Sequence, residues 1–278
     1  MSRSRAGFIS IASALAVITS GVAGCSTTDE GTPDSGADNF PRQLSAEVIE
    51  VYDHDGGAFT QGLEIDGDRL YESTGRVGES WVRSTQFDGT PVSGPDIARA
   101  ELPPPLFGEG ITVIGDDLWQ LTWKNGVAIV RDKDTLTERG RFPLTTEGWG
   151  ICAFENQLVT SDGTSTLVFR DPDTFAVTDS VEATRGGQPV ADLNELECAD
   201  DGTIYANVWQ TDTIVAIDPA DGHVSGVIDA SPLRSRLDTN GSANPVDVLN
   251  GIAQIPGTDR FLLTGKYWPQ IFEVRFVE

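Results

Sequence analysis

Residues 109–123 read EGITVIGDDLWQLTW, and this stretch decides the expected fold. A short apolar run leads into a Gly-Asp-Asp turn, and a second alternating run follows it. Two short runs of this kind around a tight turn are typical of an antiparallel β-hairpin. Glu109 itself is unusual, because a carboxylate stands between two glycines where the first strand should enter a core.

Four other segments of the chain align with this hairpin. They are QGLEIDGDRLYESTG from Gln61, WGICAFENQLVTSDG from Trp149, NELECADDGTIYANVW from Asn194 and NGIAQIPGTDRFLLTG from Asn250. The five repeats start 40 to 56 residues apart, which is the length of a four-stranded blade. We therefore predict an all-β, five-bladed β-propeller. A multi-sheet sandwich with fortuitous internal similarity is the alternative.

The last repeat is one strand short, since it reaches Glu278 after three strands. The missing outer strand is available upstream in AEVIEVYDHD, residues 46–55. Pairing this N-terminal strand with the last blade would close the ring and cover its exposed edges. We place the propeller domain at residues 46–278.

The N-terminus carries an export signal. Arg3 and Arg5 precede the apolar stretch FISIASALAVITSGVAG, which is the pattern of a secretory signal peptide. The stretch ends in VAGC, residues 22–25, which resembles the bacterial lipobox; an ordinary signal with an incidental cysteine is the alternative. We predict a signal peptide over residues 1–24, and a lipidated Cys25 with a flexible acidic tether over 25–45. The protein is then expected on the outer face of the bacterial cytoplasmic membrane or on the cell surface, anchored by its lipid.

Composition limits the partners. The chain has 43 acidic and 19 basic residues, a formal net charge of −24. Such a field repels nucleic acids, so we expect no nucleic-acid partner. We expect a monomer.

Two further cysteines, Cys152 and Cys198, lie in the first strands of adjacent repeats. In an exported protein such a pair favours a disulfide over a metal site. Their aligned positions differ by one residue, which affects side-chain direction, so buried free thiols remain the alternative.

The repeats also predict where the chemistry lies. The innermost strand of each blade begins at the axial channel, and the five aligned first positions are Gln61, Glu109, Trp149, Asn194 and Asn250. The second strands end in further polar or aromatic groups, namely Glu72, Trp123, Asp162, Asn207, Trp209, Lys266 and Trp268. Because the symmetry places equivalent positions around one axis, we expect a polar and aromatic site at one end of the channel.

Several kinds of catalytic site are excluded by the residues present. The chain has two histidines, His54 and His223, and neither stands near a nucleophile elbow. A histidine-rich zinc site and a Ser-His-Asp triad are therefore not expected. Glu109 with Lys266 and aromatic walls suits metal-free proton transfer. We expect no cofactor and no catalytic metal, and no ligand-spacing motif supports a structural cation.

These residues also carry a family resemblance. The motifs FTQGLE, YESTG, FGEGIT, EGWG, TSDGTS, LNELE, ANVWQTD, VLNGIA and TGKYWP are similar, in order and spacing, to those of plant-type and bacterial glutaminyl cyclases. The match covers nearly all of residues 46–278. That family consists of five-bladed propellers that convert an N-terminal glutaminyl residue into pyroglutamate and release ammonia. The resemblance therefore implies peptides or proteins with N-terminal glutamine as substrates.

The resemblance also implies roles for individual residues. Glu109 matches the acid–base glutamate, and Lys266 matches the active-site lysine that polarises the amide or stabilises charge. Substrate-binding positions match at Phe59, Gln61, Trp123, Trp149, Asn194 and Trp209. The alternative is a non-catalytic extracellular propeller that binds peptides or glycans. A glycosidase would need a second carboxylate, for which Glu72 is the weak candidate.

Overall fold

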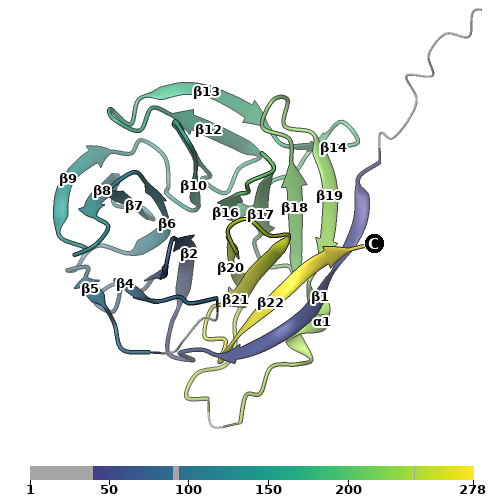
Figure 1. The fold of residues 1–278 in the computed structure, drawn as a ribbon. Helices are drawn as coiled ribbons and strands as arrows, with labels where there is room; N and C mark the ends of the chain where they lie inside the picture. The colour runs from purple at the N-terminus through teal and green to yellow at the C-terminus, as the bar shows by residue number, and fades with distance from the viewer. Residues whose placement is uncertain (1–39, 90–93, 241) are drawn as a thin grey trace, which may run out of the picture. The chain divides into compact units, whose positions relative to one another are not determined.

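Each repeat forms the inner strands of one antiparallel blade, and the blades are arranged around a common centre (Figure 1). The computed structural model describes residues 40–89, 94–240 and 242–278. The predicted signal peptide, Cys25 and most of the predicted tether lie outside these residues. The blades all belong to one compact unit, Asp38–Glu278. The predicted five-bladed propeller is confirmed.

The strands follow the order of the repeats, from the innermost strand of each blade outward. Blade 1 contains β2 (Thr60–Asp66), β3 (Arg69–Thr74), β4 (Trp81–Gln86) and β5 (Ala98–Glu101). Blade 2 contains β6 (Gly108–Ile114), β7 (Asp117–Thr122), β8 (Val127–Asp132) and β9 (Glu138–Pro143). Blade 3 contains β10 (Ile151–Phe154), β11 (Gln157–Thr160), β12 (Thr166–Arg170) and β13 (Val177–Glu182).

The remaining blades share one eight-stranded sheet. Blade 4 contains β16 (Leu193–Cys198), β17 (Ile204–Val208), β18 (Thr213–Ile217) and β19 (Val224–Asp229). Blade 5 contains β20 (Leu249–Gln254), β21 (Arg260–Gly265), β22 (Gln270–Val277) and β1 (Arg42–Asp53). A small ribbon of β14 (Thr184–Arg185) and β15 (Gln188–Pro189) and the short helix α1 (Ser231–Arg234) lie in loops. Across the described residues, no helix is long and apolar enough to cross a membrane.

The N-terminal strand closes the ring. β1 pairs antiparallel with β22 from Ser45 to Asp53, with a register shift between Val48 and Glu50. This confirms the predicted closure, although the strand begins at Arg42 rather than at residue 46. Residues 42–45 are ordered as strand because they pair parallel with β19, which joins blades 4 and 5 along their outer edges.

The inner strands converge closely at the axis. A Cβ on Gly110 would lie 2.7 Å from the Trp149 carbonyl oxygen, and one on Gly150 would lie 2.0 Å from the Asn194 carbonyl oxygen. No side chain fits at such distances, so glycine lets the neighbouring backbones meet. The Gly110 amide accordingly donates to the Trp149 carbonyl at 2.8 Å. This approach brings the first positions of the repeats to one place.

The core lies between neighbouring blades. Leu63, Leu70 and Phe87 of blade 1 pack on Ala253 and Leu262 of blade 5. Between blades 2 and 3, the buried Trp119 stacks on Phe175 with ring centroids 4.7 Å apart. Burying a large apolar side chain contributes about 1.5–3 kcal/mol, so these interfaces hold the ring rigid around its axis.

A disulfide reinforces one blade boundary. Cys152 on β10 is bonded to Cys198 on β16, with the two Cα atoms 5.3 Å apart. The predicted pairing is therefore confirmed. The one-residue offset between the aligned positions does not prevent it, because the inner strands of blades 3 and 4 pack against each other.

Candidate active site

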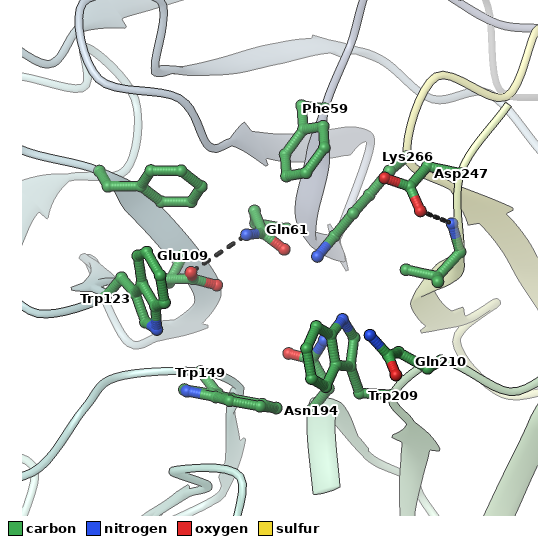
Figure 2. Close-up of a pocket in the computed structure, with 12 residues that line it drawn as sticks. Phe59, Gln61, Glu109, Trp123, Trp149, Asn194, Trp209, Gln210, Asp247 and Lys266 are labelled. Carbon is green, nitrogen blue, oxygen red and sulfur yellow. Dashed lines mark hydrogen bonds between the residues drawn. The ribbon is translucent and has the colours of Figure 1, made fainter. Parts of the chain in front are cut away.

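One end of the axis opens into a cavity of about 360 Å³. Its side chains come from the starts of first strands and the ends of second strands, so all five blades contribute to it (Figure 2). The lining residues are Phe59, Gln61, Phe107, Glu109, Trp123, Trp149, Asn194, Trp209, Gln210, Asp247, Val248 and Lys266. The eight residues predicted for catalysis and substrate binding are all among them.

Four of the five first positions line the cavity, and Asn250 lies just behind them. Its side chain is buried and donates through Nδ2 to the Thr60 carbonyl at 3.1 Å and to Gln61 Oε1 at 3.3 Å. Gln61 in turn donates through Nε2 to Glu109 Oε1 at 3.0 Å. Asn250 thus fixes the orientation of the Gln61 amide, so that its NH₂ group faces the carboxylate.

Glu109 is the acid of the cavity. It is 4% exposed at the start of β6. Burial raises the pKa of Glu109 well above its usual value, against the opposing effect of the Lys266 ammonium. The carboxylate of Glu147 raises the pKa further. Glu109 can therefore hold a proton under conditions where an exposed glutamate would be ionised.

Lys266 is the buried cationic residue of the same cavity. It follows β21, is 5% exposed, and places its Nζ 4.9 Å from the centre of the Phe59 ring. Burial lowers the pKa of Lys266, while Glu109 and Asp247 raise it. In Figure 2 the Lys266 ammonium points into the cavity on the side opposite Trp149. A carboxyl group and an amine with mutually dependent protonation thus share one water-poor space.

The walls are aromatic. Phe59 and Phe107 meet edge to face with centroids 6.3 Å apart, and Trp149 meets Trp209 in the same way at 5.4 Å. Glycine at position 75 leaves room for the phenyl rings, since a Cβ there would lie 2.3 Å from Phe107. Such walls can hold the aliphatic part of a side chain and exclude water from it.

A single carboxylate ties two wall indoles together. Glu147 Oε2 accepts hydrogen bonds from Trp123 Nε1 at 2.8 Å and from Trp149 Nε1 at 3.1 Å. Its other oxygen lies 3.2 Å from the Lys124 ammonium. Glu147 therefore sets the angle between the two rings.

The predicted set of second-strand ends was partly wrong. The residue that follows each second strand is Gly75, Trp123, Ser161, Trp209 or Lys266, and three of these line the cavity. Glu72 lies inside β3, three residues before Gly75, and its carboxylate binds His54 and Arg83 instead. It does not supply the second carboxylate that a glycosidase would need.

The remaining residues predicted at second-strand ends, Asp162, Asn207 and Trp268, do not line the cavity and have structural roles. Asp162 accepts hydrogen bonds from the backbone and hydroxyl of Thr164 and so holds a turn. Asn207 accepts from the Gly251 amide at 3.0 Å, and Trp268 donates to the Asp247 carbonyl at 3.0 Å.

Sequence reasoning missed Phe107, Gln210, Asp247, Val248 and the supporting Glu147. For three of them the repeats held a signal, because Phe107, Glu147 and Val248 stand two residues before the first positions of their blades, as Phe59 does. The residues at the positions equivalent to Asp247 and Gln210 in the other repeats do not line the cavity. Within the described part of the chain, no group of three or more His, Cys, Asp or Glu side chains is arranged to hold a metal ion.

Fold and site together define a five-bladed propeller whose axial cavity brings one buried carboxyl group and one buried lysine together between aromatic walls. The chain matches the model of the glutamine cyclotransferase family over residues 16–276. It therefore belongs to that family.

Two relatives support the assignment. The chain is 38% identical over 231 residues to a glutaminyl-peptide cyclotransferase of Arabidopsis thaliana, covering 82% of this chain and 70% of the relative. It is also 40% identical to the glutaminyl cyclase of Myxococcus xanthus, whose crystal structure it matches with a TM-score of 0.77. That match covers 85% of this chain and 98% of the other.

Proposed function

We propose that this protein is a glutaminyl-peptide cyclotransferase that converts the N-terminal glutaminyl residue of peptides and proteins into pyroglutamate and releases ammonia. The observation that carries the proposal is the pairing of the buried Glu109 with Lys266 in a cavity of about 360 Å³ with aromatic walls. A cavity of this size accepts one glutaminyl side chain together with its α-amine and adjoining peptide bond.

The reaction needs no external nucleophile. The α-amine of the substrate attacks the carbon of its own γ-carboxamide, closing a five-membered ring, and the C–N bond to the amide nitrogen breaks. Trp123, Trp149 and Trp209 hold the folded glutaminyl chain, and the Asn194 side chain is available for hydrogen bonding to it. Holding the two reacting groups in contact supplies much of the rate.

Glu109 performs both proton transfers. As carboxylate it takes a proton from the attacking amine, and as carboxylic acid it delivers that proton to the departing nitrogen, which leaves as NH₃. Burial raises its pKa well above that of an exposed glutamate, which favours the acid form that protonates the departing nitrogen. The Lys266 ammonium faces the amide oxygen, where negative charge develops in the tetrahedral intermediate. Each step uses a side chain of the cavity, so we propose a reaction without a metal or cofactor.

A coupled ammonia assay tests the function directly. The purified protein should release one equivalent of ammonia from a glutamine-initiated dipeptide, with pyroglutamyl peptide as the product by mass spectrometry. The N-acetylated form of the same dipeptide lacks the nucleophile and should be inert. Failure of every glutamine-initiated peptide tested would reject the proposal.

We also propose that the enzyme is exported, lipidated at Cys25 and held by its anchor on the outer face of the cytoplasmic membrane or on the cell surface. The sequence VAGC behind a basic and apolar N-terminus supports this. Cells given radioactive palmitate should label the wild type, whereas Cys25→Ser should remain unlabelled and leave the membrane fraction. Labelling of the Cys25→Ser variant would contradict the anchor.

We further propose that the protein is a monomer. The strand that closes the ring is the chain's own β1, so the propeller is completed without a strand from a second copy. Light scattering after gel filtration should give the mass of one chain; a dimer at micromolar concentration would refute this.

A further inference from the structure

A buried histidine lies behind the turn that carries Lys266. His54 directly follows β1, and its side chain is 2% exposed. Its Nε2 lies 2.9 Å from Glu72 Oε1, and its Nδ1 lies 2.7 Å from the carbonyl oxygen of Trp268. The catalytic scheme uses neither His54 nor Glu72, so their burial needs another explanation.

Both partners of the ring can only accept hydrogen bonds. The Trp268 oxygen is a backbone carbonyl. The Glu72 carboxylate also receives Arg83 Nη2 at 2.9 Å and Thr60 Oγ1 at 2.8 Å. Burial raises the pKa of Glu72, but a charged His54, Arg83 and Thr60 together lower it to about 2. The Arg83 and Thr60 donors favour the ionised carboxylate independently of the ring.

The imidazole must therefore carry a proton on both nitrogens. The hydroxyl of Thr264, 3.4 Å from Nδ1, donates its own proton to the Gln270 carbonyl at 2.9 Å and offers no donor to the ring. A neutral imidazole has a single N–H and could satisfy one of the two acceptors. Burial disfavours the charged ring, yet the adjoining Glu72 carboxylate raises the pKa of His54 above its usual value.

The two bonds of this imidazolium connect three parts of the ring. His54 stands at the end of the closing strand, Glu72 lies on β3 of blade 1, and Trp268 belongs to the turn between β21 and β22. In the same turn the Tyr267 amide donates to the Ala58 carbonyl at 2.7 Å. Tyr267 has a φ of +60°, a conformation that a non-glycine residue keeps only when its surroundings hold it.

We propose that His54 is a positioning residue for the reaction: its imidazolium holds the Lys266–Trp268 turn against blade 1, so that the Lys266 ammonium faces Glu109 in the cavity. This inference rests on the proposed cyclotransferase activity. Loss of one ring proton removes one of the two bonds, and the turn then presents Lys266 less accurately.

The charges around His54 set the direction of its pH dependence. Glu72 faces it from β3 and Arg83 from β4, and Asp96 and Asp55 act on Arg83. The β21–β22 turn contributes the uncharged Trp268 carbonyl and Thr264 hydroxyl. Because the pKa is raised in the folded protein, the contribution of His54 is complete below about pH 6.5 and is lost as pH rises through the folded pKa.

Nuclear magnetic resonance of the ring nitrogens tests the protonation state. The chain contains two histidines, so protein labelled with ¹⁵N-histidine gives two imidazole spin systems, and His223→Gln assigns them. His54 should show two protonated nitrogens at pH 7 and should titrate above the midpoint of a free histidine. A neutral His54 at pH 7 would overturn the proposal.

Two variants that shift the pKa of His54 in opposite directions test whether its protonation affects catalysis. Glu72→Gln removes the attractive charge and should lower the His54 midpoint by roughly one to three pH units. Arg83→Gln removes a repulsive charge and should raise it. In each variant, the decrease of kcat/KM at alkaline pH should shift in the same direction as the titration midpoint of His54. His223→Gln should leave both the pH profile and the His54 midpoint unchanged.

These outcomes separate the inference from the proposed function. Lys266 also titrates, but both variants leave its neighbours Glu109 and Asp247 in place, so a shifted limb reports on His54. An active enzyme whose alkaline limb stays fixed while the His54 midpoint moves refutes the positioning role. A wild type that releases no ammonia refutes the proposed function and the positioning role together.

Discussion

Replacing Glu109 by glutamine should separate activity from stability. We expect turnover of a glutamine-initiated dipeptide to fall by roughly 10²- to 10⁴-fold, the usual contribution of a general acid–base. This corresponds to about 2.7–5.5 kcal/mol in the activation barrier. The new side chain has the same shape and keeps an oxygen for the Gln61 Nε2 donor, now 3.0 Å from Glu109 Oε1. The loss should therefore be chemical and should not reflect a collapsed pocket.

The same substitution should raise stability at neutral pH. Because burial raises the pKa of Glu109 above 4.5, the folded wild type retains a proton that the unfolded chain has released. Wild-type stability then falls as pH rises from about 4.5 to the folded pKa, by about 1.4 kcal/mol per pH unit. The variant does not titrate there. Its thermal midpoint should exceed that of the wild type by roughly 3–5 °C for each such unit, and the gain should vanish near pH 4.5.

Glu64→Gln is the matched control. Glu64 is a half-buried glutamate on β2 outside the cavity, and its carboxylate accepts from Thr112 Oγ1 at 2.7 Å. Burial raises the pKa of Glu64 to about 7, so its replacement should also stabilise the protein at neutral pH while turnover is retained. Thermal melts from pH 4.5 to 8 and ammonia release at each pH provide both readouts. If Glu109→Gln keeps more than a tenth of wild-type turnover, or its stability gain does not depend on pH, the reasoning is wrong.

Three further outcomes follow from the structure. Glu147→Ala removes the hydrogen-bond acceptor that Trp123 and Trp149 share. Each lost hydrogen bond costs about 0.5–1.5 kcal/mol, so KM should rise several-fold up to roughly a hundredfold. An unchanged KM would mean that packing alone holds the two indoles. Replacing Cys152 and Cys198 by serine opens a link with a sequence separation of 46 residues. This should cost about 2–4 kcal/mol of stability without lowering turnover well below the melting point, and an equal thermal midpoint in the variant would show that the bond is dispensable. Prolonged dialysis against EDTA should leave kcat/KM unchanged, and a loss restored by added metal would contradict the proposed chemistry.

The fold could be predicted because the repeats express it several times. A one-residue error in the predicted ends of a single hairpin would not have changed the predicted fold, because the other four repeats show the same spacing. The parallel pairing of residues 42–45 with β19 could not be predicted from the sequence. Only Leu44 among those four residues is apolar, and it is buried in the core, so nothing in their sequence shows that the edge of blade 4 lies beside them.

The site was predictable at the first-strand positions and less so at the second-strand ends. Gly110 and Gly150 mark where the inner strands meet, which identifies Glu109 and Trp149 as neighbours of the axis. Glu72 was misplaced because the exact end of β3 decides which residue enters the cavity, and strand ends are the least certain feature of a sequence pattern. Gln210 lines the cavity, whereas Arg76 and Tyr267, at the equivalent position and with a similarly positive φ, do not, so the repeat pattern could not predict it.

The asymmetry of the ring explains how one carboxyl group can serve as both base and acid. Asn250 fixes the Gln61 amide through its oxygen, so Gln61 can only donate to Glu109 Oε1. That oxygen therefore accepts in both protonation states, and the proton of the carboxylic acid belongs on Oε2. Burial favours this protonated form and outweighs the Lys266 ammonium, which favours the ionised one. In the proposed reaction, Gln61 and Asn250 keep Oε1 occupied, so Oε2 is the oxygen that would take up the proton and return it to the substrate.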